Sequence, residues 1–93
     1  MKYFNDVSVL ALNLQKLGYV FDTYDPKKYL SRYVKMVASG AIVFMVFEGN
    51  ELVDYDFHLF DTKKSHSGFM EKCYTTLEED LKKLKEMEKN ERI

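Results

Sequence analysis

The chain has 93 residues and a net charge of −1 at pH 7, although 31% of its residues are charged. This length predicts a single domain that spans residues 1–93. A nearly neutral chain lacks the basic excess of general nucleic-acid binders and the acidic excess that a mimic of DNA needs. Its one cysteine, Cys73, excludes an internal disulfide and a cysteine-based zinc cage, and we expect this residue in the core.

No segment of the sequence has the pattern of a signal peptide or of a membrane span. Polar residues interrupt the start of the chain before Val7, and the longest wholly apolar run covers residues 41–47. The sequence also has no glycine-rich phosphate loop, and no cofactor is expected. We therefore predict a cytoplasmic protein that does not enter a membrane.

The first predicted element is a helix that begins after Asn5 or Asp6, because either side chain can cap a helix start. Gly18 suits the left-handed position that follows a helix, and Tyr19 can then pack back on Leu14. The aromatic and β-branched segment from Tyr19 to Tyr24 predicts a short strand. The inner face of the helix consists of Val7, Leu10, Ala11, Leu14 and Leu17.

Two interpretations remain for residues 25–40. In the first, Asp25 caps a second helix and Pro26 occupies its first position. In the second, the same two residues start a turn, and the segment that follows is a strand because aromatic and β-branched residues are frequent in it. We favour the helix, because Arg32 and Lys35 would point to opposite faces of a strand and clean alternation is missing.

Residues 41–47 predict the central strand of a sheet, since they are apolar on both faces. A turn leads into a second strand at 52–60, which completes an antiparallel hairpin. Helices or a partner should cover both faces of the central strand. If helices cover one face, the other needs a partner, most simply a second copy of the chain. In the second strand, Val53, Tyr55, Phe57 and Leu59 should face the core, and Asp54, Asp56 and His58 should face outward.

A polar loop at residues 61–68 should precede a long final helix that begins near Phe69 and is highly charged toward its end. The predicted fold is α+β: a helix, a short strand, a second helix, an antiparallel hairpin and a long charged helix. The alternative is a helix, a four-stranded antiparallel meander and a helix. The apolar stripe of the last helix consists of Met70, Cys73, Tyr74, Leu77, Leu81, Leu84 and Met87.

Three residues with metal-ligand chemistry lie at strand spacing. Asp54, Asp56 and His58 would share one face of their strand, and carboxylate and imidazole groups suit Mg²⁺ or Mn²⁺. A metal-dependent hydrolase or nuclease is one hypothesis from this pattern. The ordinary explanation is a solvated sheet face with alternate polar residues, and it outweighs the metal site because short motifs often occur by chance.

Charged residues are segregated along the chain. Lys27, Lys28, Arg32 and Lys35 occur without an intervening acid, and on the predicted second helix they would form one basic face. A nucleic-acid-binding protein that uses this face is a further hypothesis. Acidic residues gather between positions 41 and 61, and two opposite patches on a nearly neutral body also suit docking to another protein.

The preferred hypothesis is a small non-enzymatic protein that acts through protein–protein contacts. Catalytic motifs are missing, tyrosines are abundant, and the charge patches are separate. Lysine far outnumbers arginine, as in AT-rich bacterial or phage genomes, so a phage or mobile-element protein that inhibits or regulates a host enzyme fits the composition. A protein partner is expected, with a homodimer as a second option. The predicted partner-binding residues are Tyr24, Lys27, Lys28, Tyr29, Arg32, Asp54, Asp56 and His58.

Overall fold

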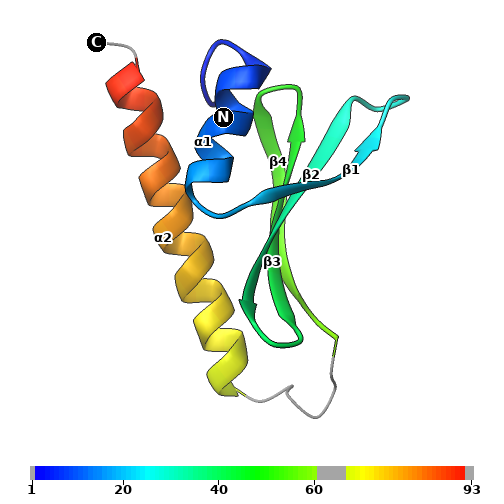
Figure 1. Ribbon diagram of the computed structural model, residues 1–93, viewed down its shortest axis with the longest axis vertical. Helices are drawn as coiled ribbons and strands as arrows, with labels where there is room; N and C mark the ends of the chain where they lie inside the picture. The colour runs from blue at the N-terminus through cyan, green and yellow to red at the C-terminus, as the bar shows by residue number, and fades with distance from the viewer. Residues whose placement is uncertain (1, 61–66, 92–93) are drawn as a thin grey trace.

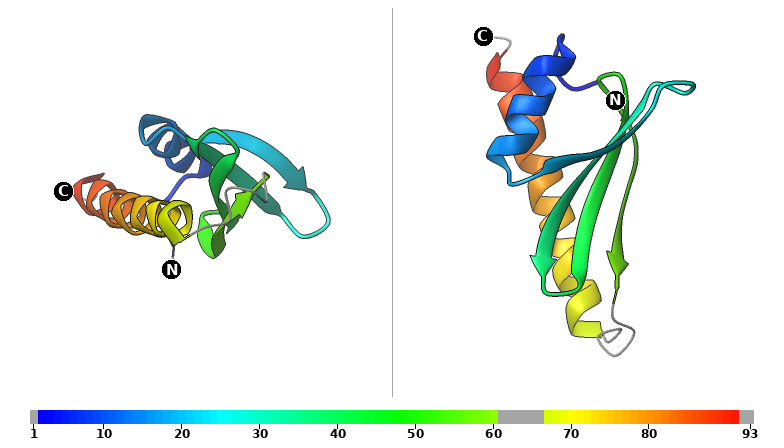
Figure 2. Two further views of the ribbon diagram at one scale, coloured as in Figure 1. Left: turned by 90° about the horizontal axis from the view of Figure 1, so that it is seen from below. Right: turned by 45° about the vertical axis from the view of Figure 1, so that its right-hand side comes forward.

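The computed structural model describes residues 2–60 and 67–91, which form the predicted α+β fold. Four strands make one antiparallel sheet in the order β1-β2-β3-β4. Both helices lie on the same side of this sheet, as Figure 1 and Figure 2 show. The elements are α1 (Val7–Lys16), β1 (Val20–Asp25), β2 (Leu30–Ala38), β3 (Ala41–Glu48), β4 (Glu51–Leu59) and α2 (Ser67–Glu91).

The prediction of a second helix is wrong, and the four-stranded meander is the correct alternative. The segment forms β2, which pairs with β1 on one side and β3 on the other. Asp25 and Pro26 start a turn, in which the Lys27 amide donates a hydrogen bond to Asp25 Oδ1 at 3.0 Å. The aromatic and β-branched composition of the segment therefore prevails over its apparent helical periodicity.

The two side chains that argued against a strand have separate partners on its two faces. Arg32 pairs with Asp22 on the side away from the helices, where Nη2 lies 2.5 Å from Oδ2. Lys35 points toward α2, where its Nζ lies 2.9 Å from Oδ2 of Asp80. The irregular polarity of β2 thus reflects two ion pairs that the spacing of residues does not reveal.

Both ends of α1 follow the predicted capping pattern. Asp6 is the N-cap and accepts a hydrogen bond at 2.7 Å from the backbone amide two residues later. Gly18 has a φ of +97°, and its amide donates to the Gln15 carbonyl at 3.0 Å. The Tyr19 amide donates to the Leu14 carbonyl, also at 3.0 Å. These two bonds form a Schellman motif, which turns the chain directly into β1.

The core lies between the helices and one face of the sheet. α2 contributes the buried residues Cys73, Leu77 and Leu84, so the predicted core position of the cysteine is confirmed. Met70 and Tyr74, at the start of the predicted stripe, remain 38% and 52% exposed. The four β3 residues that face the helices are fully or almost fully buried, namely Ala41, Val43, Met45 and Phe47.

β4 departs from the predicted alternation at one point. A register shift opposite the end of β3 moves Val53 out of the core, where it is 47% exposed, and brings Leu52 against the core instead. Phe57 and Leu59 pack against the core as predicted, whereas Tyr55 is 51% exposed. The bulge therefore changes which side chains of the first half of β4 reach the core.

α2 begins at Ser67, two residues before the predicted start at Phe69. Most of the predicted polar loop, residues 61–66, lies outside the described residues. Within the described part of the chain, no helix combines the length and the apolar character that crossing a membrane requires. The helix instead packs a narrow apolar stripe against the sheet.

Candidate functional site

The predicted partner-binding residues divide between two surfaces. Tyr24, Lys27, Lys28 and Tyr29 lie on a hairpin arm, which we define as residues 20–31 and which projects beyond the helices in Figure 1. The remaining predicted residues lie on the side of the sheet that faces away from the helices, which we call the open face. These open-face residues are Arg32, Asp54, Asp56 and His58.

The hairpin arm exposes three large aromatic side chains. Phe21 is 58% exposed, Tyr24 is 49% exposed and Tyr29 is 67% exposed. Phe21 also makes an edge-to-face contact with Tyr33, with ring centroids 5.8 Å apart. Rigid aromatic groups that offer both apolar area and a polar tip are common in protein–protein contacts.

Tyr29 has an unusual backbone conformation at the end of the turn. Its φ is +55°, in the left-handed region that glycine and asparagine adopt more readily. Such a conformation costs about 1 kcal/mol or more for an ordinary side chain. Its carbonyl accepts a hydrogen bond from the Gly49 amide at 3.2 Å, but its side chain points into solvent.

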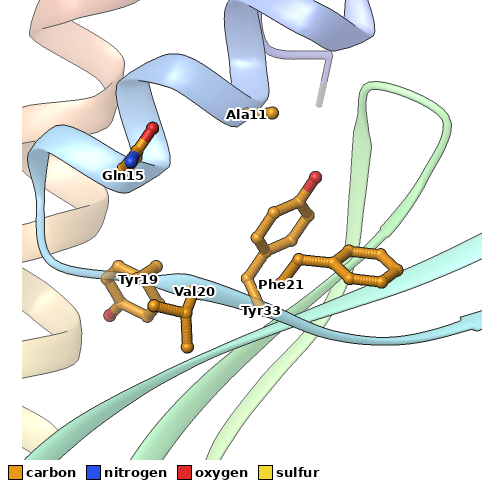
Figure 3. A pocket seen from close by; sticks show the side chains of 6 residues that line it. All are labelled: Ala11, Gln15, Tyr19, Val20, Phe21 and Tyr33. Carbon is orange, nitrogen blue, oxygen red and sulfur yellow. The ribbon is translucent and has the colours of Figure 1, made fainter.

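A groove separates the base of the arm from α1. It has a volume of about 390 Å³ and lies beside the exposed Phe21 ring (Figure 3). Tyr33 is 93% buried, given its exposed fraction of 7%, and its ring stands up from β2 with the hydroxyl directed into the groove. Within residues 2–60 and 67–91 this hydroxyl has no hydrogen-bond partner. The lining residues are Ala11, Gln15, Tyr19, Val20, Phe21 and Tyr33.

A buried polar network lies under one end of this groove. The Tyr19 hydroxyl and the Lys35 ammonium both donate to Asp80 Oδ2 at 2.9 Å. Burial and then the Asp80 charge raise the pKa of Tyr19 well above its usual range. The network ties α2 to β2 and to the turn after α1. Sequence reasoning missed it, because Asp80 lies within a run of charged residues that otherwise resemble a solvated helix end.

The open face carries an apolar centre with charged groups around it. Ile42, Phe44 and Val46 of β3 are half-buried there, and no described helix covers them, so of the two predicted coverings, helices or a partner, helices cover only the opposite face. The Arg32 guanidinium lies 5.7 Å from the centre of the Phe44 ring. His58 makes an edge contact with Phe60 across a shallow hollow of about 340 Å³ on this face.

Asp54 and Asp56 share the open face with His58, as predicted, but their carboxylates make local contacts. Asp54 Oδ1 accepts from the Tyr55 amide at 2.9 Å, and Asp56 Oδ1 accepts from the Phe57 amide at 2.8 Å. These bonds occupy backbone donors on β4, which is an edge strand of the sheet. Among the described residues, no three His, Cys, Asp or Glu side chains lie close enough to hold a metal ion.

The basic face predicted for residues 27–35 does not form, because the helix that would display it is absent. Lys27 and Lys28 lie in the turn at the tip of the arm, Arg32 lies on the open face, and Lys35 points toward α2. The nucleic-acid hypothesis therefore loses its geometric basis.

No protein-family model, curated protein or solved structure matches the chain. Any functional assignment therefore depends on the geometry of the two surfaces.

Proposed function

We propose that this protein acts by binding a partner protein through the hairpin arm and the adjoining groove. The observation that carries the proposal is the position of exposed aromatic side chains beside a groove into which the largely buried Tyr33 directs a solvent-accessible hydroxyl. Phe21 and Tyr24 supply apolar area on the arm, and the Tyr33 hydroxyl supplies a directed donor in the groove. Apolar hollows with a few placed polar groups are typical of binding sites.

The tip of the arm adds a preference for partner charge. Lys27 and Lys28 lie in the exposed turn between β1 and β2, next to Tyr29. Two lysines at the end of a projecting hairpin favour an acidic surface on the partner and accelerate association at low ionic strength. Inhibition or regulation of an enzyme by a small protein of phage or mobile-element origin is the form of this function that the lysine-rich composition supports.

Tyr29 offers a test in which folding and binding change in opposite directions. Asparagine tolerates the left-handed conformation better than tyrosine, so Tyr29→Asn should raise the free energy of unfolding by roughly 0.5–1 kcal/mol. The same change removes an exposed aromatic group and should weaken partner binding by about tenfold or more. If Tyr29 served only folding, its replacement would not raise the free energy of unfolding while weakening partner binding.

The experiment compares immobilised wild-type protein with Tyr29→Asn, Tyr24→Ala and Phe21→Ser variants in lysate of the source cells. Met70→Ala serves as the control, because Met70 is a partly exposed apolar residue on α2, away from the arm. The expected result is one partner that the wild type and the control retain and the three arm variants lose. Equal retention of that partner by all variants, or no partner for the wild type, would show that the arm is not the binding surface.

A further inference from the structure

The open face is arranged in rows that run across the sheet. Neighbouring strands place Arg32, Val46 and Asp54 in one row, because Val46 pairs with the other two in the sheet register. The next row contains Val34, Phe44 and Asp56, and the third contains Met36, Ile42 and His58. In these rows β3 presents apolar side chains, β2 presents Arg32 and two apolar side chains, and β4 presents a polar column.

The charges in the first row are opposite in sign and lie symmetrically about β3. Arg32 is one strand away on β2, and Asp54 is one strand away on β4. Both side chains are exposed on the face. Such a row is complementary to a copy of itself that has been turned about an axis along β3.

We propose that a second copy of this chain covers the open face, with a two-fold axis that runs along β3 between the two sheets. This operation places β4 of one copy over β2 of the other and keeps the rows aligned. Asp54 of each copy then lies opposite Arg32 of the other, and the Phe44 rings meet at the centre. Two sheets packed in this aligned way are separated by about 10 Å, a gap that apolar side chains fill.

Electrostatics distinguishes this arrangement from the other face-to-face dimer. An axis across the strands at the level of the Phe44 row would stack β4 on β4 and oppose Asp56 of one copy with Asp56 of the other. Like charges at close range are destabilising, so this second arrangement is disfavoured. The axis along β3 replaces the repulsion with two Arg32–Asp54 pairs at the edges of the contact.

Arg32 can make the new contact and keep its present one. Its guanidinium already pairs with Asp22 and lies over the Phe44 ring. A guanidinium has five donors in a fixed plane, so it can bind a second carboxylate from the opposing copy. Its contact with Phe44 restricts the guanidinium before association, which reduces the entropy lost on binding.

The size of the face sets the expected strength of the dimer. β3 has eight residues, so it is about 27 Å long, and the three strands that overlap about this axis, β2, β3 and β4, are about 14 Å wide. The contact therefore covers about 390 Å² on each copy, or about 780 Å² in total, which is the size of a weak, transient interface. We expect a reversible dimer with a dissociation constant on the order of 10–100 micromolar.

The test uses charge reversal in two separate variants, Arg32→Asp and Asp54→Arg. Each variant alone would face itself with two like-charge pairs, and its dissociation constant should rise at least about 30-fold. An equimolar mixture of the two variants restores both opposite-charge pairs, so a heterodimer should form within about threefold of wild-type affinity. Analytical ultracentrifugation measures all four samples, and circular dichroism checks that each variant is folded.

Two further variants keep the result decisive. Ile42→Glu places a carboxylate on β3, where it would face the same carboxylate of the other copy across the axis, so it should abolish the dimer, and circular dichroism again checks the fold. Lys83→Asp reverses a charge on the exposed side of α2 and should leave the dimer unchanged. Variants of the hairpin arm should also leave the dimer unchanged, since they alter the surface proposed for partner binding and not the open face. A wild-type monomer at millimolar concentration, or a mixture of the two charge variants that does not associate, would overturn the proposal.

Discussion

Replacement of Asp80 should destabilise the protein more than any other single charge removal on α2. The carboxylate is 4% exposed and accepts two hydrogen bonds, from Tyr19 and from Lys35. A hydrogen bond to a charged group contributes about 1.5–3 kcal/mol to stability. Asp80→Ala removes both bonds and leaves the Tyr19 hydroxyl buried without its acceptor.

The expected magnitude follows from the exposure of the two donors. The Lys35 side chain is 26% exposed, so water can solvate its ammonium group once Asp80 is removed. The hydrogen bond from Lys35 therefore contributes an energy at the lower end of this range. Tyr19 is 1% exposed, so its hydroxyl cannot regain water without a rearrangement. We expect Asp80→Ala to lower the free energy of unfolding by about 3 kcal/mol, equivalent to a loss of about 12–24 °C in the melting temperature of a domain of this size.

Urea and thermal unfolding, followed by circular dichroism, measure this effect. Glu79→Ala is the matched control, because Glu79 is the preceding residue on α2, carries the same charge and is exposed. It should change stability by less than about 0.5 kcal/mol. A cost of less than about 1 kcal/mol for Asp80→Ala would refute the assignment of a stabilising buried network.

A combined variant tests the electrostatic origin of the cost. Removal of Lys35 alone, as Lys35→Met, leaves a buried carboxylate with one remaining donor and should also cost about 3 kcal/mol. When the whole network becomes apolar, as Tyr19→Phe, Lys35→Met and Asp80→Leu together, no unpaired polar group is left. Stability should then recover to within about 1 kcal/mol of the wild type, because buried ion pairs can often be replaced by packed apolar groups.

Three other predictions concern buried groups and the turn after α1. Burial raises the pKa values of Tyr3, Tyr19 and Tyr33, so the folded state favours the protonated phenols. Their contribution to stability is complete below the unfolded pKa of about 10 and is lost as pH rises from there toward the raised folded values, so urea midpoints should fall between about pH 10 and pH 12. A constant midpoint over this range would contradict the prediction. Burial also raises the pKa of the Cys73 thiol, so Ellman's reagent should react at least about 100-fold more slowly with folded than with unfolded protein. Gly18→Ala should lower the free energy of unfolding in urea more than Gly49→Ala does. The reason is that an added Cβ lies 3.3 Å from Lys35 Cε at position 18 and meets no atom within 4 Å at position 49. Equal losses would mean that the Lys35 side chain moves aside without cost.

Local sequence determined the elements whose signals are short-range. Asp6 and Gly18 define the ends of α1, because capping depends on residues within one turn of each other. The hairpin of β3 and β4 follows from an apolar run, a turn and an alternating strand. The apolar spacing on α2 predicted the buried positions of Cys73 and Leu84.

The sequence also placed Asp54, Asp56 and His58 on one outward face, since alternation in a strand needs no tertiary information. The separation of the partner-binding residues into an arm and an open face was not predictable, because it depends on the strand order and on which side of the sheet the helices occupy. The groove at Tyr33 was missed for the same reason, since its walls come from α1, β1 and β2.

Tertiary structure alone decided whether the segment around Arg32 and Lys35 is a helix or a strand. Its local preferences are nearly balanced, and β2 forms because it can pair with strands on both sides while each charged residue meets an acid. One of those acids, Asp80, is 45 residues away in sequence, so no local pattern contains the pair. The attraction within a buried ion pair offsets the cost of removing both charges from water only when the fold brings the two residues together. This is why the sequence by itself left β2 undecided.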